Sequence, residues 1–170
     1  MTSDQQAGSD AVFERLFRDN RQRVFNYVYR LVGDAELAEE LTQQAFVKAY
    51  RALPRLPAEA NRRSWLYRIA TNSAYDYLRR RRLISWLPLR ERDSLSGVER
   101  GPDGTASEQD TVQRTLAHLS PSHRAVLILY CVEGYSTVEI SQMLGSTAGA
   151  VKTRLCRARE EFRQAYAKES

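Results

Sequence analysis

The chain has 170 residues, 42% of them hydrophobic, which is enough for one ordinary domain or two small ones with a buried core. Lys and Arg outnumber Asp and Glu by 26 to 21, and the net charge of +5 favours an acidic partner such as nucleic acid. Two cysteines are too few for a disulfide framework, so a reducing, cytoplasmic location is expected. The polar N-terminus predicts no signal peptide, and the absence of a long apolar run predicts no direct membrane insertion.

Three helices are predicted in the first half of the chain, over residues 12–32, 35–53 and 62–82. Apolar side chains recur at the helical period in each, and Gly33 and Asp34 suit the end of the first helix and the start of the second. The core stripe predicted for the third helix consists of Trp65, Leu66, Ile69, Tyr77 and Leu78. Since no alternating β pattern occurs, residues 10–83 are predicted to form an N-terminal helical bundle.

A second helical domain is predicted over residues 111–168, after a flexible linker at residues 84–110. An apolar island at the start of the linker could dock on the first domain or on a partner; it consists of Trp86, Leu87 and Leu89. Ser120 and Pro121 form a strong helix start, and Tyr130 and Cys131 are expected in the core. The predicted fold class is all-α, with an N-terminal bundle and a C-terminal helix-turn-helix domain.

Residues 136–159 have the anatomy of a helix-turn-helix. Ser136 and Glu139 form a capping-box pattern, Gly145 suits the end of the short helix, and Thr147 suits the cap of the next one. That second helix begins with small residues and then carries Lys152, Arg154, Arg157 and Arg159. Such side chains reach guanine edges or phosphates from a helix in the major groove, so the pattern favours DNA binding over a merely solvated basic face.

The third predicted helix carries a second basic pattern. Its arginines are Arg62, Arg63, Arg68, Arg79, Arg80, Arg81 and Arg82, set against the single acid Asp76. Four aromatic residues are interleaved with them, namely Trp65, Tyr67, Tyr75 and Tyr77. Arginines can follow a phosphate backbone, and rings can stack unpaired bases at about 1–3 kcal/mol each. The alternative is that Trp65 and Tyr77 are core residues and that the last arginines are a solvated helix end.

The second predicted helix has a polar face of the opposite character. It carries Glu36, Glu39, Glu40, Gln43 and Gln44. An acidic face of this kind repels DNA, so it suits either a basic protein partner or water.

Together these features resemble the extracytoplasmic-function (ECF) group of bacterial sigma factors over nearly the whole chain. The similar stretches occur in the family's order, at residues 38–46, 63–79, 119–127, 133–140 and 149–159. The resemblance implies a subunit that binds core RNA polymerase and directs promoter-specific transcription initiation. It also implies promoter DNA as a second partner and a cognate anti-sigma factor as a regulator.

The resemblance implies roles for individual residues. Glu40 and Gln43 match positions that dock on a coiled coil of the polymerase, and the whole acidic face is expected to contribute, although Gln44 replaces a usual acid. The loop at residues 54–61 corresponds to one that holds a flipped minus-ten base. The minus-ten candidates are Arg62, Arg63, Arg68, Asn72, Tyr75, Arg79 and Arg80. The minus-thirty-five candidates are Thr147, Lys152, Thr153, Arg154, Cys156 and Arg157.

Two other functional classes remain open from the residues alone. A stand-alone helix-turn-helix repressor or activator explains the C-terminal domain but leaves the acidic face and the Arg-rich helix unassigned. A nuclease or recombinase needs a metal cluster or an activated nucleophile. The two histidines, His118 and His123, are expected to be structural or exposed. No catalytic residue, metal site or cofactor is therefore predicted, and the protein is not expected to be an enzyme.

Overall fold

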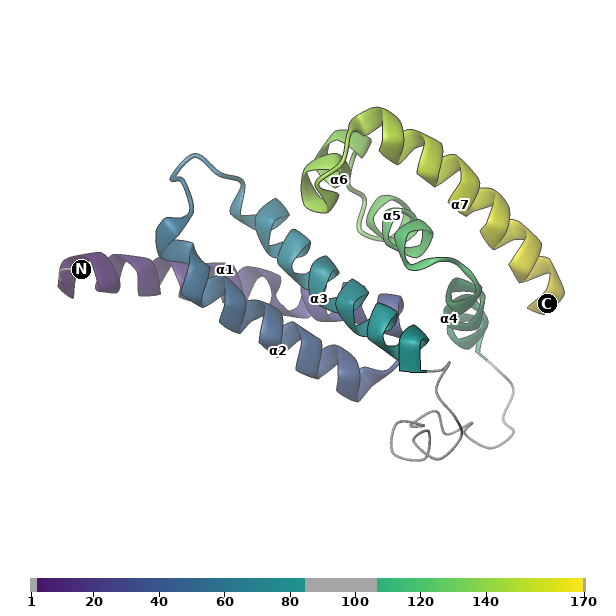
Figure 1. Cartoon of the computed structure of the whole chain (residues 1–170), viewed down its shortest axis with the longest axis horizontal. Helices are drawn as coiled ribbons and strands as arrows, with labels where there is room; N and C mark the ends of the chain where they lie inside the picture. Colours follow the sequence, from purple (N-terminus) through teal and green to yellow (C-terminus); the bar gives the residue numbers. More distant parts are fainter. Residues whose placement is uncertain (1–2, 85–106, 170) are drawn as a thin grey trace.

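The computed structural model describes residues 3–84 and 107–169, with side chains from residue 7 onward. Within these ranges the chain is helical and contains no strand, so the predicted all-α class is confirmed (Figure 1). The apolar island at residues 86–89 and most of the predicted linker lie outside the described residues. The helices form an N-terminal bundle of α1–α3 and a C-terminal bundle of α4–α7.

The N-terminal bundle contains α1 (Ser3–Val32), α2 (Ala35–Ala52) and α3 (Arg62–Ile84), with the short 3-10 turn η1 (Leu53–Arg55) after α2. Gly33 has a φ of +78°, and the Asp34 carboxylate accepts a hydrogen bond from the Leu37 amide at 2.8 Å, as the sequence predicted. The start predicted for the first helix was wrong, because α1 begins at Ser3 rather than at residue 12. Periodicity locates only the part of a helix that packs on a core, and the polar first turns carry no such signal.

The core stripe predicted for the third helix was only partly right. Leu66 is fully buried, but Trp65, Ile69, Tyr77 and Leu78 are half-buried at the edge of the core. Tyr67, placed among the base-stacking candidates, is fully buried. The reason is topological: α3 lies between α1 and α2 on one side and α6 on the other, so it buries two faces instead of one (Figure 1).

The C-terminal bundle contains α4 (Glu108–His118), α5 (Pro121–Cys131), α6 (Thr137–Leu144) and α7 (Ala148–Glu169). Ser120 caps α5 with Pro121 in the first turn, as predicted. The capping box of Ser107 and Asp110 starts α4 three residues before the predicted domain start at residue 111. The Ser-x-x-Asp pattern at residues 107–110 is the sequence signal that would have located that start.

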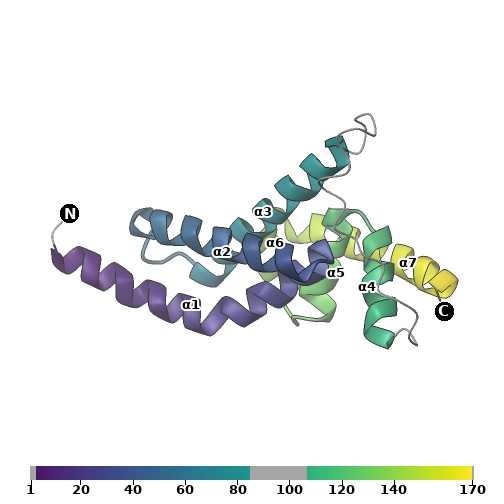
Figure 2. The ribbon, with the colours of Figure 1, turned by 90° about the horizontal axis from the view of Figure 1, so that it is seen from below.

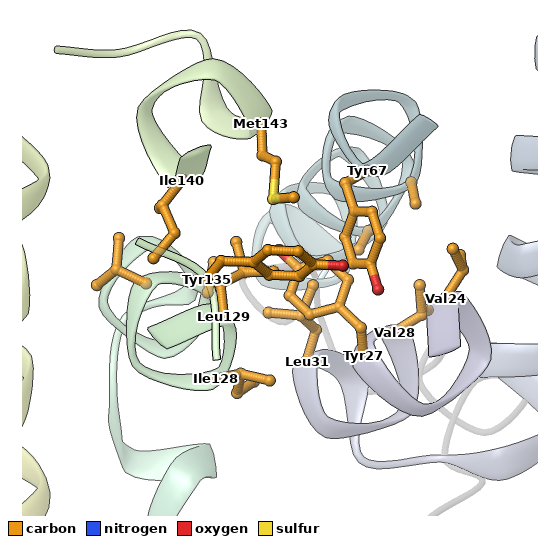
Figure 3. Packing of buried hydrophobic residues seen from close by; sticks show 14 of the residues in the cluster. Val24, Tyr27, Val28, Leu31, Tyr67, Ile128, Leu129, Tyr135, Ile140 and Met143 are labelled. Atoms are coloured by element: carbon orange, nitrogen blue, oxygen red, sulfur yellow. The ribbon is translucent and has the colours of Figure 1, made fainter. Parts of the chain in front are cut away.

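The two bundles pack directly on each other. Helix α6 lies along α3, and the last turns of α1 contact α4 and α5 (Figure 2). Their buried residues form one continuous hydrophobic cluster, which includes Val28 and Leu31 of α1 and Ile128 and Leu129 of α5 (Figure 3). The sequence indicated two domains but did not indicate this shared core.

Candidate nucleic-acid and polymerase interfaces

The helix-turn-helix has the local geometry that its sequence predicted. Ser136 Oγ accepts from the Glu139 amide at 3.2 Å, and the Glu139 carboxylate accepts from the Ser136 amide at 2.7 Å. These bonds hold the pKa of Glu139 below its usual value. Gly145 ends α6 with a φ of +62°, a left-handed backbone conformation that residues other than glycine rarely adopt. Thr147 Oγ1 then accepts from the Ala150 amide at 3.1 Å and caps α7.

Helix α7 presents most of the minus-thirty-five candidates to solvent. Val151, Leu155 and Ala158 face the core, so the opposite side of the helix is free. The exposed candidates are Thr147, Lys152, Thr153, Cys156 and Arg157. Arg154 differs, because it is half-buried and lies close enough to Tyr75 of α3 for its charge to affect that phenol. Most of the predicted minus-thirty-five side chains therefore lie on one solvent-exposed face of α7.

A cleft of about 590 Å³ runs beside this exposed face. Its lining residues are Tyr130, Ser136, Thr137, Lys152, Leu155, Cys156, Arg159 and Arg163. The Arg159 guanidinium lies 4.9 Å from the centre of the Tyr130 ring, at cation–π distance. Tyr130 is 37% exposed and Cys131 is exposed, so the prediction that both lie in the core was wrong. Helix α5 buries its middle residues, and its last turn projects past the core.

Helix α3 brings most of the minus-ten candidates to the surface. The exposed ones are Arg62, Arg63, Arg68, Asn72, Arg79 and Arg80. Arg79 forms an ion pair with Asp76 at 2.8 Å, while Arg68 donates a hydrogen bond to the Gln142 carbonyl of α6 at 2.6 Å. Tyr75 is half-buried, and this burial raises its pKa to about 12 against the opposing charges of Arg154 and Arg124.

The loop before α3 is the segment expected to hold a flipped base. It follows η1, and its residues 57–59 are exposed. Asn61 closes the loop, because its side-chain oxygen accepts from the Ser64 amide at 3.0 Å. The sequence interpretation missed this cap, although Asn three residues before the first buried position is its usual signal.

Helix α2 presents the acidic face to solvent. Glu36, Glu40, Gln43 and Gln44 are exposed, and Glu39 is half-buried beside Arg21 at 3.5 Å. Within the face, Gln43 donates to Glu39 at 3.3 Å and Gln44 donates to Glu40 at 3.0 Å. Since exposed pairs of this kind add little stability, the carboxylates remain available to a basic partner.

Family models match two parts of the chain. The model described as Sigma-70 region 2 matches residues 16–84, which comprise most of α1 and all of α2 and α3. The model described as Sigma-70, region 4 matches residues 109–162, from α4 into α7. The chain belongs to the sigma-70 family.

Relatives of this sigma factor are named as transcription factors of the same kind. The chain is 33% identical over 93% of its length to the ECF RNA polymerase sigma factor SigE of Mycolicibacterium smegmatis, of which it spans 63%. It is also 33% identical over 92% of its length to the RNA polymerase sigma factor CarQ of Myxococcus xanthus, of which it covers 90%. The family models and these relatives support the predicted ECF group.

A solved structure has the same fold as this sigma factor. It is the sigma factor RpoE in complex with the anti-sigma factor NepR from Bartonella quintana, with a TM-score of 0.72 and 22% identity. The match covers 90% of this chain and 95% of that chain. At this identity the comparison shows the fold alone.

The remaining expectations concern enzymatic activity, the two histidines and membrane insertion. Sigma factors are initiation factors and not enzymes, so the family assignment confirms the expected class. His118 and His123 lie 3.1 and 2.7 Å from Glu169 and Glu161, where they join α4 and α5 to α7. No helix in the described ranges 3–84 and 107–169 is long and apolar enough to cross a membrane.

Proposed function

We propose that the chain binds core RNA polymerase and directs it to specific promoters as an ECF sigma factor. The single observation that supports this most is the combination, within a sigma-70 chain, of an exposed acidic face on α2 with basic faces on α3 and α7. A DNA-binding protein that acts alone has no use for the acidic face. That face therefore favours the sigma function over a stand-alone repressor or activator.

In this proposal the work is divided between the three regions that were predicted from the sequence. Residues 10–83 bind the polymerase through α2 and trap the unpaired minus-ten strand with α3 and the loop at 54–61. Residues 111–168 bind the minus-thirty-five duplex through α7, and residues 84–110 join the two domains. Strand opening needs no nucleotide hydrolysis by this chain, because preferential binding of the single strand shifts the population of promoter DNA towards the open state.

The deciding experiment is runoff transcription from a family-type promoter, with purified core polymerase in the presence and absence of the chain. We expect a specific transcript only when both are present. A matched variant replaces Glu40 and Gln43 by Lys, and it should lose transcription together with core binding. If promoter binding is tight without polymerase and transcription does not depend on the chain, the stand-alone regulator is the correct alternative.

A cognate anti-sigma factor is the proposed regulator, by analogy with the complex of RpoE and NepR. An apolar groove of about 540 Å³ suits such a partner, since it crosses from Arg30 of α1 to the C-terminal bundle. Its apolar lining comprises Val112, Leu116, Leu127, Ile128, Val132 and Phe162. Three arginines accompany this lining, namely Arg30, Arg159 and Arg163. An amphipathic helix with acidic flanks complements both features.

Purification of the untagged chain from the cytoplasm of its native cells tests whether an anti-sigma factor copurifies with it. Val132→Glu, at a position 51% exposed, should release the anti-sigma factor by placing an acid among the groove arginines. Val138→Glu is the matched control, because Val138 is 56% exposed and lies outside the groove. Recovery of the chain with core polymerase alone, or equal effects of both variants, would count against the proposal.

A further inference from the structure

The cleft beside α7 carries positive charge that the minus-thirty-five candidates do not fully account for. Four of its lining residues recur every three or four positions and so form one stripe of α7, namely Lys152, Cys156, Arg159 and Arg163. Arg159 and Arg163 belong to none of the base-contacting candidates, and both are exposed. Every residue that lines the cleft is either uncharged or basic, so the cleft attracts an anion.

Arg159 is the arginine of this stripe whose charge is not neutralised. Arg163 forms an ion pair with Glu160 at 2.7 Å. Arg159, one turn earlier, has no carboxylate partner within residues 3–84 and 107–169, and the group that it contacts is the ring of Tyr130. A free guanidinium at the edge of a basic cleft is therefore available to an anionic ligand.

The Tyr130 ring prepares Arg159 for such a ligand. The donors of a guanidinium lie in its plane, so a ring over its face leaves them free to bind two oxygens of one phosphate. The ring also restricts the long side chain, which then loses less rotamer freedom when the ligand binds. Tyr130 is half-exposed in the last turn of α5, so core packing alone does not account for it.

The place of Arg159 along α7 identifies the kind of phosphate that it can meet. Recognition helices contact base edges with their N-terminal residues, in a major groove about 8.5 Å deep. Arg159 follows Lys152 by two helical turns, which is about 10.5 Å along the axis. When Lys152 is at the bases, Arg159 is therefore at the level of the sugar–phosphate backbone that borders the groove.

We propose that Arg159, positioned by Tyr130, binds a backbone phosphate of the upstream duplex and sets how far α7 enters the groove. Phosphate contacts fix the register of a protein on DNA without reading its sequence. Arg159 thus supplies affinity and depth, while Lys152 and Arg157 supply sequence preference. The inference rests on the proposed function in one respect, that α7 is the helix that enters the DNA.

The variant that tests the contact is Arg159→Gln, with Arg18→Gln as the matched control. Gln keeps a polar side chain and removes the charge, and Arg18 is an exposed arginine of α1 in the N-terminal bundle. The measurement is the anisotropy of fluorescent duplex DNA titrated with the whole chain at several salt concentrations. Two duplexes are used, one with a family-type upstream element and one with that element scrambled.

The salt dependence distinguishes a phosphate contact from a structural role. Each phosphate contact contributes about 0.9 to the slope of log affinity against log salt concentration. Arg159→Gln should reduce this slope by about one and weaken binding at least about threefold at low salt, equally for both duplexes. Arg18→Gln should leave the slope unchanged. Misfolding lowers the active fraction without changing the slope, so an unchanged slope for Arg159→Gln would overturn the proposal.

Substitutions of Tyr130 test its positioning role. Tyr130→Phe keeps the ring and should match the parent in both affinity and slope. Tyr130→Leu removes the ring and should weaken binding, by less than Arg159→Gln does. In the Arg159→Gln background, Tyr130→Leu should have no further effect, because its action passes through the arginine. An equal effect in both backgrounds would overturn the positioning role.

A free phosphorylated molecule has the same chemistry as the DNA backbone, and pyrophosphate is the probe for it. At constant ionic strength, pyrophosphate should displace the duplex equally from the parent and from Arg159→Gln. Preferential displacement from the parent, with an unchanged salt slope in the variant, would assign the cleft to a free anion and overturn the proposal. These measurements need no polymerase, so failure of runoff transcription alone would overturn the proposed function and leave the phosphate site intact.

Discussion

Helices α3 and α7 are both long, basic and amphipathic, yet they occupy opposite environments. Helix α7 lies at the edge of the molecule and packs on α4, α5 and α6 with one side, so Lys152 and Arg157 face solvent. Helix α3 lies in the middle, with α1 and α2 on one side and α6 on the other. Similar residue patterns thus differ in availability because of topology and not because of composition.

This difference suits the kind of DNA that each helix is proposed to bind. A duplex groove has the same shape before and after binding, so a rigid, open face such as that of α7 can recognise it at once. Unpaired minus-ten bases exist only after melting, and α3, held between other helices, presents its exposed arginines mainly towards its two ends. The following predictions test this contrast, from the largest expected effect to the smallest.

Leu129→Ala should destabilise the whole chain. Leu129 is fully buried in the cluster shared by both bundles, and truncation of such a side chain costs about 2–5 kcal/mol. Because the core is continuous, thermal unfolding should remain one transition that moves to lower temperature. Val138→Ala, on the surface of α6, is the control. Two separate transitions, of which Leu129→Ala moves only one, would show that α3 and α7 belong to independent folding units.

Lys152→Ala combined with Arg157→Ala should abolish minus-thirty-five preference. Each base-edge contact contributes about 1–3 kcal/mol, so transcription from a consensus promoter should fall at least about tenfold. Both side chains are exposed, so stability and core binding should not change. The measurement is runoff transcription on promoters with intact and scrambled upstream elements, with Lys168→Ala as the control. Lost core binding would mean that this face of α7 serves the polymerase.

Ser136→Ala should weaken the helix-turn-helix by about 1 kcal/mol, the usual cost of an N-cap, as measured by denaturant unfolding. Loss of the serine also changes the acid response. Hydrogen bonds from the Ser136 amide and, to a smaller extent, its hydroxyl lower the pKa of Glu139 in the folded chain, so the carboxylate stabilises the fold above its unfolded pKa. The alanine variant keeps the amide and loses only the part that the hydroxyl contributes. That contribution disappears as pH falls through the folded pKa. The difference between parent and variant should therefore shrink in acid; a constant difference would contradict this account.

Arg79→Ala should have the smallest effect on stability. Its ion pair with Asp76 is largely exposed, with side-chain exposures of 72% and 51%. The free energy of unfolding should therefore change by less than about 1 kcal/mol. Open-complex formation on promoter DNA should decrease more visibly, because an arginine near the phosphates is lost. Arg81→Ala is a neighbouring control outside the minus-ten candidates. If both variants behave alike, Arg79 acts through general charge and not through a specific contact.

Local features were the ones that could be predicted from the sequence. Caps such as Asp34 and Ser136 act within a few residues, so their patterns located helix starts correctly. The contact between the bundles could not be predicted, because Tyr67 and Tyr135 are far apart along the chain and each resembles an ordinary aromatic residue. Arg124 gave no signal either, since a buried arginine that donates to three carbonyls has the same local sequence as a solvated one. The DNA and polymerase contacts themselves remain predictions.

The length of α1 has a mechanical consequence. Its 30 residues rise about 1.5 Å each, which gives a path of about 45 Å along a helix that bends in its middle (Figure 2). Part of this helix packs along α2, and the carbonyls of Arg30 and Leu31 near its C-terminal end accept hydrogen bonds from the C-terminal bundle. Helix α1 is therefore a single element that both bundles share, so the position of one bundle is tied to that of the other.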